Sequence, residues 1–186
     1  MLALLAAAII AVDVVIQAGH QGRPASCALF PQRPCNLGAV GERAATPVVA
    51  DEAARELRAA GFRVARVPAD YREHYATRAS VFIHFDGADP PCTTGASIGY
   101  PQGNAADAAA ARAWRTVYAR VFPFRFMPDN FTTNLSRYYG FRTVTPNPTN
   151  LVLELGELSC PAQRAWLVPR LRRLGHTIAD FVRSRL

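Results

Sequence analysis

The sequence contains no lysine, and this absence removes several kinds of chemistry at the outset. All 21 of its basic residues are arginine. A Schiff-base lysine and the phosphate-binding lysine of a Walker A loop are therefore excluded. Apolar runs of the roughly 18 residues that a membrane-spanning helix needs are also missing. Without a C-x-x-C pair, neither a thioredoxin-like redox site nor a zinc knuckle is favoured.

Acidic residues are fewer than basic ones, and the chain has a net charge of +7. This excess predicts an anionic partner, for which nucleic acid, an anionic polymer of the cell envelope and an anionic membrane surface all fit. A coding bias that replaces lysine by arginine is the alternative explanation of the arginine content. The arginines are spread from Arg23 to Arg185 without a dense run, which gives a nucleic-acid partner little support.

The 186 residues have the length of one domain, and no repeat or linker divides them. Residues 2–11 form an apolar stretch as long as the core of a signal peptide, with Ala11 as a small residue before cleavage, although a positively charged leader is missing. The alternative is that this stretch extends the first buried strand, 12–17. We take 1–11 as a signal-like segment and 12–186 as the folded domain, which predicts a location outside the cytoplasm.

The four cysteines allow three pairings if all are oxidised. Cys27 and Cys35 flank a short proline-rich segment that a disulfide could close. Cys92 and Cys160 each follow the end of a predicted strand and could meet at the edge of a sheet. An even number of cysteines beside a signal-like segment favours an oxidising compartment.

Strand and helix patterns alternate along the chain. We predict strands at 12–17, 62–67, 80–85, 96–100 and 151–155, and helices at 46–60, at 104–122 and from residue 161 onward. Thr46 and Pro47 suit the N-cap and first position of the first helix, and Pro169 predicts a kink in the last. This order predicts an α/β fold: a single domain with a twisted, mostly parallel or mixed sheet and helices on both faces.

Three polar side chains interrupt or end these apolar strands: His20, His84 and Glu154. Functional residues of such sheets gather at the carboxyl ends of the strands. A buried carboxylate is costly unless it is paired, hydrogen-bonded or bound to a metal. A hydrolytic zinc ion explains all three residues. The alternative is two hydrogen-bonded core histidines and an arginine-paired glutamate, and no local spacing rule decides between the two.

Four segments of the sequence resemble, in the correct order, the blocks of a known enzyme family. They are VVIQAGH (14–20), GE (41–42) with the following helix and AAGFRV (59–64), VFIHFDG (81–87) and LVLELGELS (151–159). Together they resemble the zinc-dependent N-acetylmuramoyl-L-alanine amidases of the amidase-3 family. The likeness extends from residue 12 to the C-terminal helix and is weakest across 101–150.

The resemblance implies a zinc (Zn2+) site made by His20, Glu42 and His84, with Glu154 as the general acid and base. It also implies hydrolysis of the amide bond between N-acetylmuramic acid and L-alanine in bacterial peptidoglycan. In this interpretation the partner is the cell wall and not nucleic acid.

The sequence departs from the family at several positions. It reads GHQG where GHGG is usual, it has Phe82 where serine is common, and Glu157 replaces a usual phenylalanine. Glu157 therefore competes with Glu154 for the catalytic role; we favour Glu154 because it lies in the strand, whereas Glu157 is expected in a solvated turn. Arg72 and Arg78 are candidates for a substrate-binding arginine.

The segment 122–141 is rich in aromatic residues, which fit either core packing or a platform for a ligand. Its donors Asn130, Asn134 and Arg137 are candidates for lining a substrate groove. The departures leave a catalytically reduced peptidoglycan-binding or regulatory module as one alternative function. A zinc carboxypeptidase or another zinc amidohydrolase is a second, although no local H-x-x-E pair surrounds His20 or His84.

Overall fold

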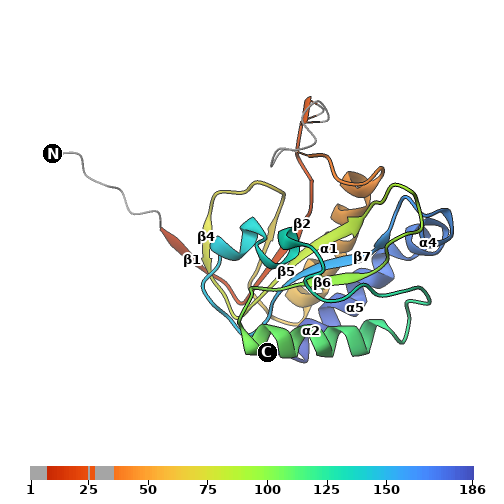
Figure 1. The fold of residues 1–186 in the computed structure, drawn as a ribbon. Coiled ribbons are helices and arrows are strands. Elements are labelled where there is room, and N and C mark those ends of the chain that lie inside the picture. Colours follow the sequence, from red (N-terminus) through yellow and green to blue (C-terminus); the bar gives the residue numbers. More distant parts are fainter. Residues whose placement is uncertain (1–7, 25, 28–35) are drawn as a thin grey trace.

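The computed structural model describes residues 8–24, 26–27 and 36–186. A five-stranded sheet of order β3-β2-β5-β7-β6 forms its centre (Figure 1). The strands are β2 (Val14–Ala18), β3 (Val64–Val67), β5 (Ala79–Asp86), β6 (Ser97–Gly99) and β7 (Asn150–Glu157). Neighbouring strands are parallel except for β6, which runs antiparallel to β7. The predicted α/β fold with a mixed sheet is therefore confirmed.

Two different layers cover the sheet. The core on one face is built with α1 (Glu42–Ala59), α2 (Ala105–Tyr118) and α5 (Leu171–Arg183). The other face carries a smaller core that includes Phe82, Tyr138 and Phe141. The short helices α3 (Thr133–Ser136) and η2 (Tyr139–Arg142) lie over that face (Figure 1). Helices thus occupy both faces, as predicted, but the long ones share one side.

The first helix begins at Glu42, four residues before the predicted start. Thr46 does not act as its N-cap, because its hydroxyl donates to the carbonyl oxygens of Gly19 (2.7 Å) and Glu42 (3.1 Å). Pro47 lies inside the helix. The prediction that the helix starts at Thr46 and Pro47 was therefore wrong. Glu42, which was expected to precede the helix, is its first residue.

The C-terminal helix is interrupted near Pro169, as predicted. It consists of α4 (Pro161–Leu167), the 3-10 turn η3 (Val168–Arg170) and α5. A proline cannot donate a backbone hydrogen bond, which accounts for the break. In α2 the side chain of Asn104 caps the helix by accepting from the amides of Ala106 and Asp107.

The N-terminal part of the described chain adds a second, two-stranded sheet. β1 (Ile9–Ala11) pairs in parallel with β4 (His74–Ala76), and the side chains of Ile9 and Ile10 are exposed. β1 belongs to the segment that the sequence marks as signal-like, and residues 1–7 of that segment lie outside the described residues. No helix in the described ranges has the length and apolar character needed to cross a membrane.

A disulfide joins Cys92 to Cys160, which is one of the pairings that the sequence left open. It connects the loop after β5 to the residue that precedes α4. The second predicted pairing involves Cys35, which lies outside the described residues.

Candidate metal centre

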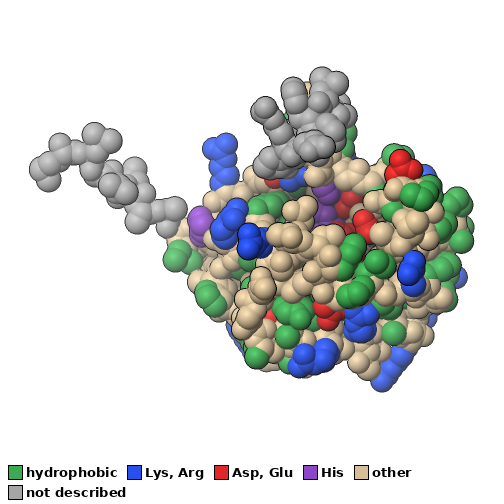
Figure 2. All heavy atoms as spheres, in the orientation of Figure 1, with side chains coloured by type: hydrophobic (Ala, Val, Ile, Leu, Met, Phe, Trp, Pro, Cys, Tyr) green, Lys and Arg blue, Asp and Glu red, His purple; other side chains and the backbone are tan. Residues whose placement is uncertain are grey.

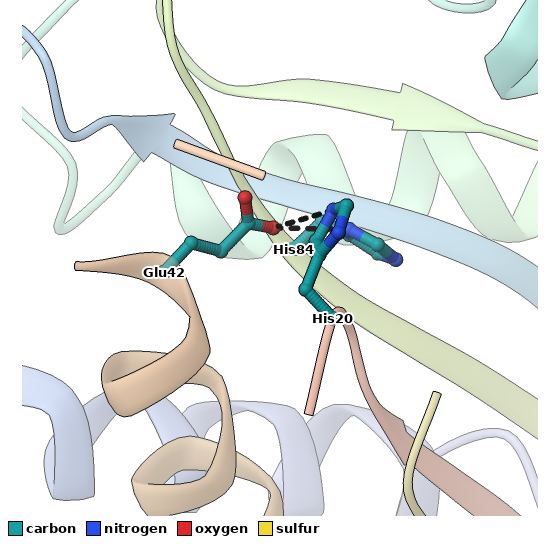
Figure 3. Close-up of side chains that lie close together, drawn as sticks. All are labelled: His20, Glu42 and His84. Atoms are coloured by element: carbon teal, nitrogen blue, oxygen red, sulfur yellow. Dashed lines mark hydrogen bonds and ion pairs between the residues drawn. The ribbon is translucent and has the colours of Figure 1, made fainter. Parts of the chain in front are cut away.

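His20, Glu42 and His84 meet at the carboxyl edge of the parallel strands (Figure 3). His20 follows the end of β2, His84 lies near the end of β5, and Glu42 opens α1. All three side chains are buried, and their nearest nitrogen and oxygen atoms lie within 4.8 Å of one another. The structure thus brings together the three residues that the resemblance implied, from three separate parts of the chain.

One carboxylate oxygen of Glu42 lies near both imidazoles (Figure 3). Its Oε1 is 3.0 Å from Nδ1 of His84 and 3.6 Å from Nε2 of His20. The same oxygen accepts the backbone N–H of Phe85 (3.0 Å), and Oε2 accepts that of Ala39 (2.8 Å). Burial opposes ionisation of Glu42, but its contacts with His84 and His20 and the hydrogen bond from the Phe85 amide outweigh this effect and lower the pKa of Glu42.

His20 is oriented by a backbone carbonyl. Its Nδ1 lies 3.0 Å from the carbonyl oxygen of Asn36, which also accepts a hydrogen bond of 2.8 Å from Arg23. Nη1 of Arg23 also lies 3.1 Å from Nδ1 of His20. In the tautomer with its proton on Nδ1, His20 donates to the Asn36 oxygen and leaves Nε2 free to face Glu42. Arg23 is itself held by two 2.8 Å bonds to Asp70. Burial is the main cause that lowers the pKa of His20, which favours the neutral ring that a metal requires.

His84 is oriented by a chain of partly buried hydrogen bonds on its other side. Its Nε2 lies 2.9 Å from the hydroxyl of Tyr138, and that hydroxyl donates to Oε1 of Gln17 at 2.5 Å. Since the hydroxyl proton is used in this way, Nε2 of His84 must be the protonated nitrogen. The Gln17 amide in turn donates to the hydroxyl of Tyr139 at 2.7 Å.

This arrangement fits a divalent cation. A neutral His84 protonated at Nε2 directs the lone pair of Nδ1 at a carboxylate oxygen of Glu42, and the two would repel unless a cation or a second proton lies between them. Two neutral imidazoles and one carboxylate are the ligands that hydrolytic zinc sites use. The donor set and its orientation therefore suit a metal.

Two glycines let the backbone approach these ligands closely. A Cβ at Gly19 would lie 2.4 Å from the ring of His84. A Cβ at Gly38 would lie 2.1 Å from Oε2 of Glu42 and 2.6 Å from the ring of His20. Any larger residue at either position would displace the ligands. The close packing of the three ligand side chains therefore requires glycine at both positions.

Glu154 lies beside the three ligands, in register with His84 on the neighbouring strand β7. Its Oε2 is buried and has no hydrogen-bond partner among the described residues. Burial, and then the nearby carboxylates of Glu42 and Asp86, raise the pKa of Glu154 well above its ordinary value. The structure thus shows a carboxyl group with an unused oxygen and an affinity for a proton.

Glu157 has a different environment from the solvated turn that the sequence predicted. It is fully buried at the end of β7. Its carboxylate accepts the amides of Cys92 (2.6 Å) and Thr94 (2.8 Å) and the hydroxyl of Ser159 (2.5 Å). The expected exposure was wrong, because these donors hold the 92–94 loop on Glu157 and leave its carboxylate engaged in structure.

An open cleft of about 1110 Å³ contains His20, Glu42, His84 and Glu154. Figure 2 shows histidine and acidic side chains gathered in this hollow on the visible face. Of the predicted groove residues, Asn134 and Arg137 line the cleft.

The remaining candidates lie elsewhere. The Asn130 side chain accepts the amide of Tyr100 instead. Arg78 donates to the backbone oxygen of Leu186, and neither Arg78 nor Arg72 lines the cleft.

The aromatic segment serves mainly as core. Phe122, Phe124 and Phe126 pack into the larger hydrophobic cluster, while Tyr138 and Phe141 pack into the smaller one. Phe131, Tyr138 and Tyr139 also line the cleft, and of these Phe131 is exposed.

Sequence reasoning missed the residues that orient the ligands. Gln17 carried a usable signal, because it is a polar residue inside the apolar strand VVIQA. Arg23 and Tyr138 lie in irregular segments and carried none.

A second group of potential ligands lies on α1 and α5 and consists of Glu52, Glu56 and His176. Arg55 and Arg172 already pair with Glu52 there. These arginines neutralise the carboxylate that a metal would need, so we assign no metal to this group.

The fold is that of solved amidase structures. Ami1 from Mycobacterium smegmatis, an N-acetylmuramyl-L-alanine amidase, aligns with a TM-score of 0.67 and 17% identity over 96% of this chain and 97% of its own. The catalytic domain of the amidase CwlV from Bacillus (Paenibacillus) polymyxa var. colistinus gives 0.62 and 18% over 95% and 97%. The amidase AmiC2 of Nostoc punctiforme gives 0.64 and 14% over 96% and 98%. No family model and no curated protein sequence matches the chain. The resemblance of the four sequence blocks therefore extends to the whole chain at the level of fold: the protein has the fold of the N-acetylmuramoyl-L-alanine amidases.

Proposed function

We propose that this protein is a zinc-dependent hydrolase that cleaves the amide bond between N-acetylmuramic acid and L-alanine in bacterial peptidoglycan. The observation that carries the proposal is the meeting of His20, Glu42 and His84 beside the unpartnered carboxyl oxygen of Glu154, in one open cleft. The fold shared with solved amidases supports the choice of substrate.

The ligand atoms in this proposal are Nε2 of His20, Oε1 of Glu42 and Nδ1 of His84. Three protein ligands are typical of a catalytic zinc site, which keeps a position open for water or substrate. Zinc bound there would polarise the scissile carbonyl and lower the pKa of water. The chain's own contribution is to fix the orientation of both rings through Asn36 and Tyr138 and to favour the neutral form of His20 by burial.

Glu154 is proposed as the residue that moves the proton. Its free oxygen accepts a proton from the attacking water while the water oxygen bonds to the carbonyl carbon. The same carboxyl then delivers that proton to the amide nitrogen as the C–N bond breaks. The products are the lactyl carboxylate of the muramic acid and a peptide with a free N-terminal L-alanine.

The substrate and the disulfide both favour action outside the cytoplasm. Peptidoglycan lies there, and the disulfide between Cys92 and Cys160 requires an oxidising compartment. The net charge of +7 would favour adsorption to an anionic wall. Export directed by the signal-like residues 1–11 belongs to the same proposal.

Digestion of purified peptidoglycan tests the proposal. The wild-type protein should release peptides with free N-terminal L-alanine without creating new reducing sugar ends, and a chelator should abolish the release. Glu154→Gln should lower the rate at least ~100-fold, as expected for loss of a general acid and base, with zinc content unchanged. Glu73→Gln, which removes an exposed carboxylate, is the matched control and should retain full activity.

Three outcomes would overturn the proposal. Release of no free L-alanine from any peptidoglycan would favour the alternative of a binding or regulatory module. Insensitivity to the chelator would exclude the metal. Full activity of Glu154→Gln would exclude the assigned proton carrier.

A further inference from the structure

A second cleft, of about 230 Å³, lies where the end of α2 meets α4 and the start of α5. It is lined by Arg120, Val121, Trp166, Arg170, Arg173, Leu174 and Thr177. Three of these residues are arginines, and no acidic residue of the described chain lines the cleft. It shares no lining residue with the larger cleft that holds the metal centre.

The arginines of this cleft lack the carboxylate partners that other arginines of the protein have. Arg172 pairs with Glu52, and Arg183 with Asp180. By contrast, the side chains of Arg120 and Arg173 make no ion pair or hydrogen bond within the described residues. Several positive charges around one small cleft repel one another, and a bound anion would offset that repulsion.

Trp166 lines the cleft, and its ring also makes edge-to-face contacts with Phe122 and Phe124. The guanidinium of Arg170 lies 4.9 Å from the centre of its ring and donates to its carbonyl oxygen at 2.9 Å. These contacts hold Arg170 in place while its other N–H groups stay free. An indole beside fixed guanidinium groups suits a ligand with both an anionic group and a carbon skeleton.

We propose that this cleft binds phosphate groups, and that its ligand is an anionic phosphodiester polymer of the cell wall. Guanidinium groups from three positions match the several oxygens of a phosphate better than the single plane of a carboxylate. Trp166 would pack against the sugar or polyol between successive phosphates. Because the site lies apart from the catalytic cleft, the bound polymer would hold the protein on the wall without blocking the substrate. Phosphate binding stands by itself, whereas the choice of polymer rests on the proposed function.

Tryptophan fluorescence offers a direct assay, since Trp114 is 1% exposed and Trp166 is the more accessible of the two tryptophans. The full-length protein is titrated with inorganic phosphate, with a glycerol phosphate oligomer and with oligogalacturonate as the carboxylate comparison. We expect saturable binding of both phosphate probes, with the oligomer tighter, and at least tenfold weaker binding of the carboxylate.

The double variant Arg120→Ala/Arg173→Ala should weaken binding of the oligomer at least tenfold. The control Arg112→Ala/Arg185→Ala removes two other exposed arginines and therefore the same charge. It should change the affinity for the oligomer less than twofold. An equal loss of oligomer binding in both double variants would show that net charge alone causes the effect, and would overturn the assignment of a site to this cleft. Equally tight binding of oligogalacturonate would contradict the proposed preference for phosphate. Binding of inorganic phosphate without binding of the oligomer would contradict the proposal that the ligand is a polymer. Cleavage of a soluble muramyl peptide by Arg120→Ala/Arg173→Ala should stay at the wild-type rate, so failure of this site is distinguishable from failure of the proposed hydrolysis.

Discussion

Removing the hydroxyl of Tyr138 should weaken metal binding although Tyr138 is not a ligand. In the wild-type protein this hydroxyl accepts the Nε2 proton of His84 and donates to Gln17. Tyr138→Phe leaves the Nε2–H donor of His84 without its partner in a buried place. The proton can then move to Nδ1, which is the nitrogen that must stay free for the metal.

The size of the effect follows from that lost bond. Leaving a buried donor unsatisfied costs about 1–3 kcal/mol, and about 1.4 kcal/mol corresponds to a tenfold change in an equilibrium constant. Residues that orient a metal-binding histidine typically change metal affinity 10- to 100-fold when mutated. We therefore expect the zinc dissociation constant of Tyr138→Phe to rise about 10- to 100-fold.

A competition titration with a chromogenic chelator would measure the dissociation constant. The matched control is Tyr139→Phe, which removes a hydroxyl that contacts Gln17 and the amide of Asp70 but no histidine. It should change the constant less than threefold. Nitrogen chemical shifts of the His84 ring in the zinc-loaded wild type should show a proton on Nε2, and this form should be less populated in Tyr138→Phe at the same zinc concentration. Unchanged zinc affinity in Tyr138→Phe, or an equal loss in Tyr139→Phe, would refute the reasoning.

Two further predictions concern stability. Burial raises the pKa of Asp107 to about 6, against an ordinary value of 3.8. The folded state therefore holds this proton more tightly than the unfolded state. As a result, the free energy of unfolding should fall as the pH rises from about 4 to 6. Asp107→Asn keeps an acceptor for the amide of Asn150 but places N–H donors where Oδ2 has no partner. Its stability relative to wild type should therefore increase by about 3 kcal/mol between pH 4 and pH 7. Urea denaturation across the pH range measures this change, and a constant difference at every pH would contradict the assignment. Removing the disulfide with Cys92→Ser/Cys160→Ser should lower the free energy of unfolding by about 2–4 kcal/mol, because the disulfide closes a long loop of the chain. An unchanged melting temperature in thermal denaturation would show that the disulfide adds no stability.

The order of the five strands in the main sheet and of the long helices could be predicted from the sequence because apolar periodicity determines it, whereas the short elements β1, β4 and α3 were not predicted. The strands VVIQA of β2 and ASVFIHFD of β5 are buried almost throughout, as continuous apolar runs of a parallel sheet should be. The start of α1 could not be predicted in this way. Thr46 and Pro47 have the residue types of a helix start, but the hydroxyl of Thr46 bonds to Gly19 on a neighbouring segment. A tertiary contact therefore overrides the local signal.

The three ligands also differ in whether the sequence pattern could predict them. His20 and His84 stand out as polar residues in or after apolar strands, whereas Glu42 lies in the first turn of a helix, where an acidic residue is ordinary. It was identified only through the family resemblance. Tyr138 belongs to a segment without periodicity, so no pattern could link it to His84, which lies 54 positions earlier in the sequence.

Burial of a carboxyl group alone does not identify a functional residue, and three cases in this protein show what does. Glu157 is fully buried, but its oxygens are occupied by backbone and hydroxyl donors. Asp107 is fully buried with one free oxygen, but it is absent from the lining of both clefts described above. Glu154 combines a free buried oxygen with a place in the cleft, next to His84 in register. The combination matters because a proton carrier needs an unused oxygen and access to substrate, and neither property can be derived from the strand pattern that first singled out Glu154.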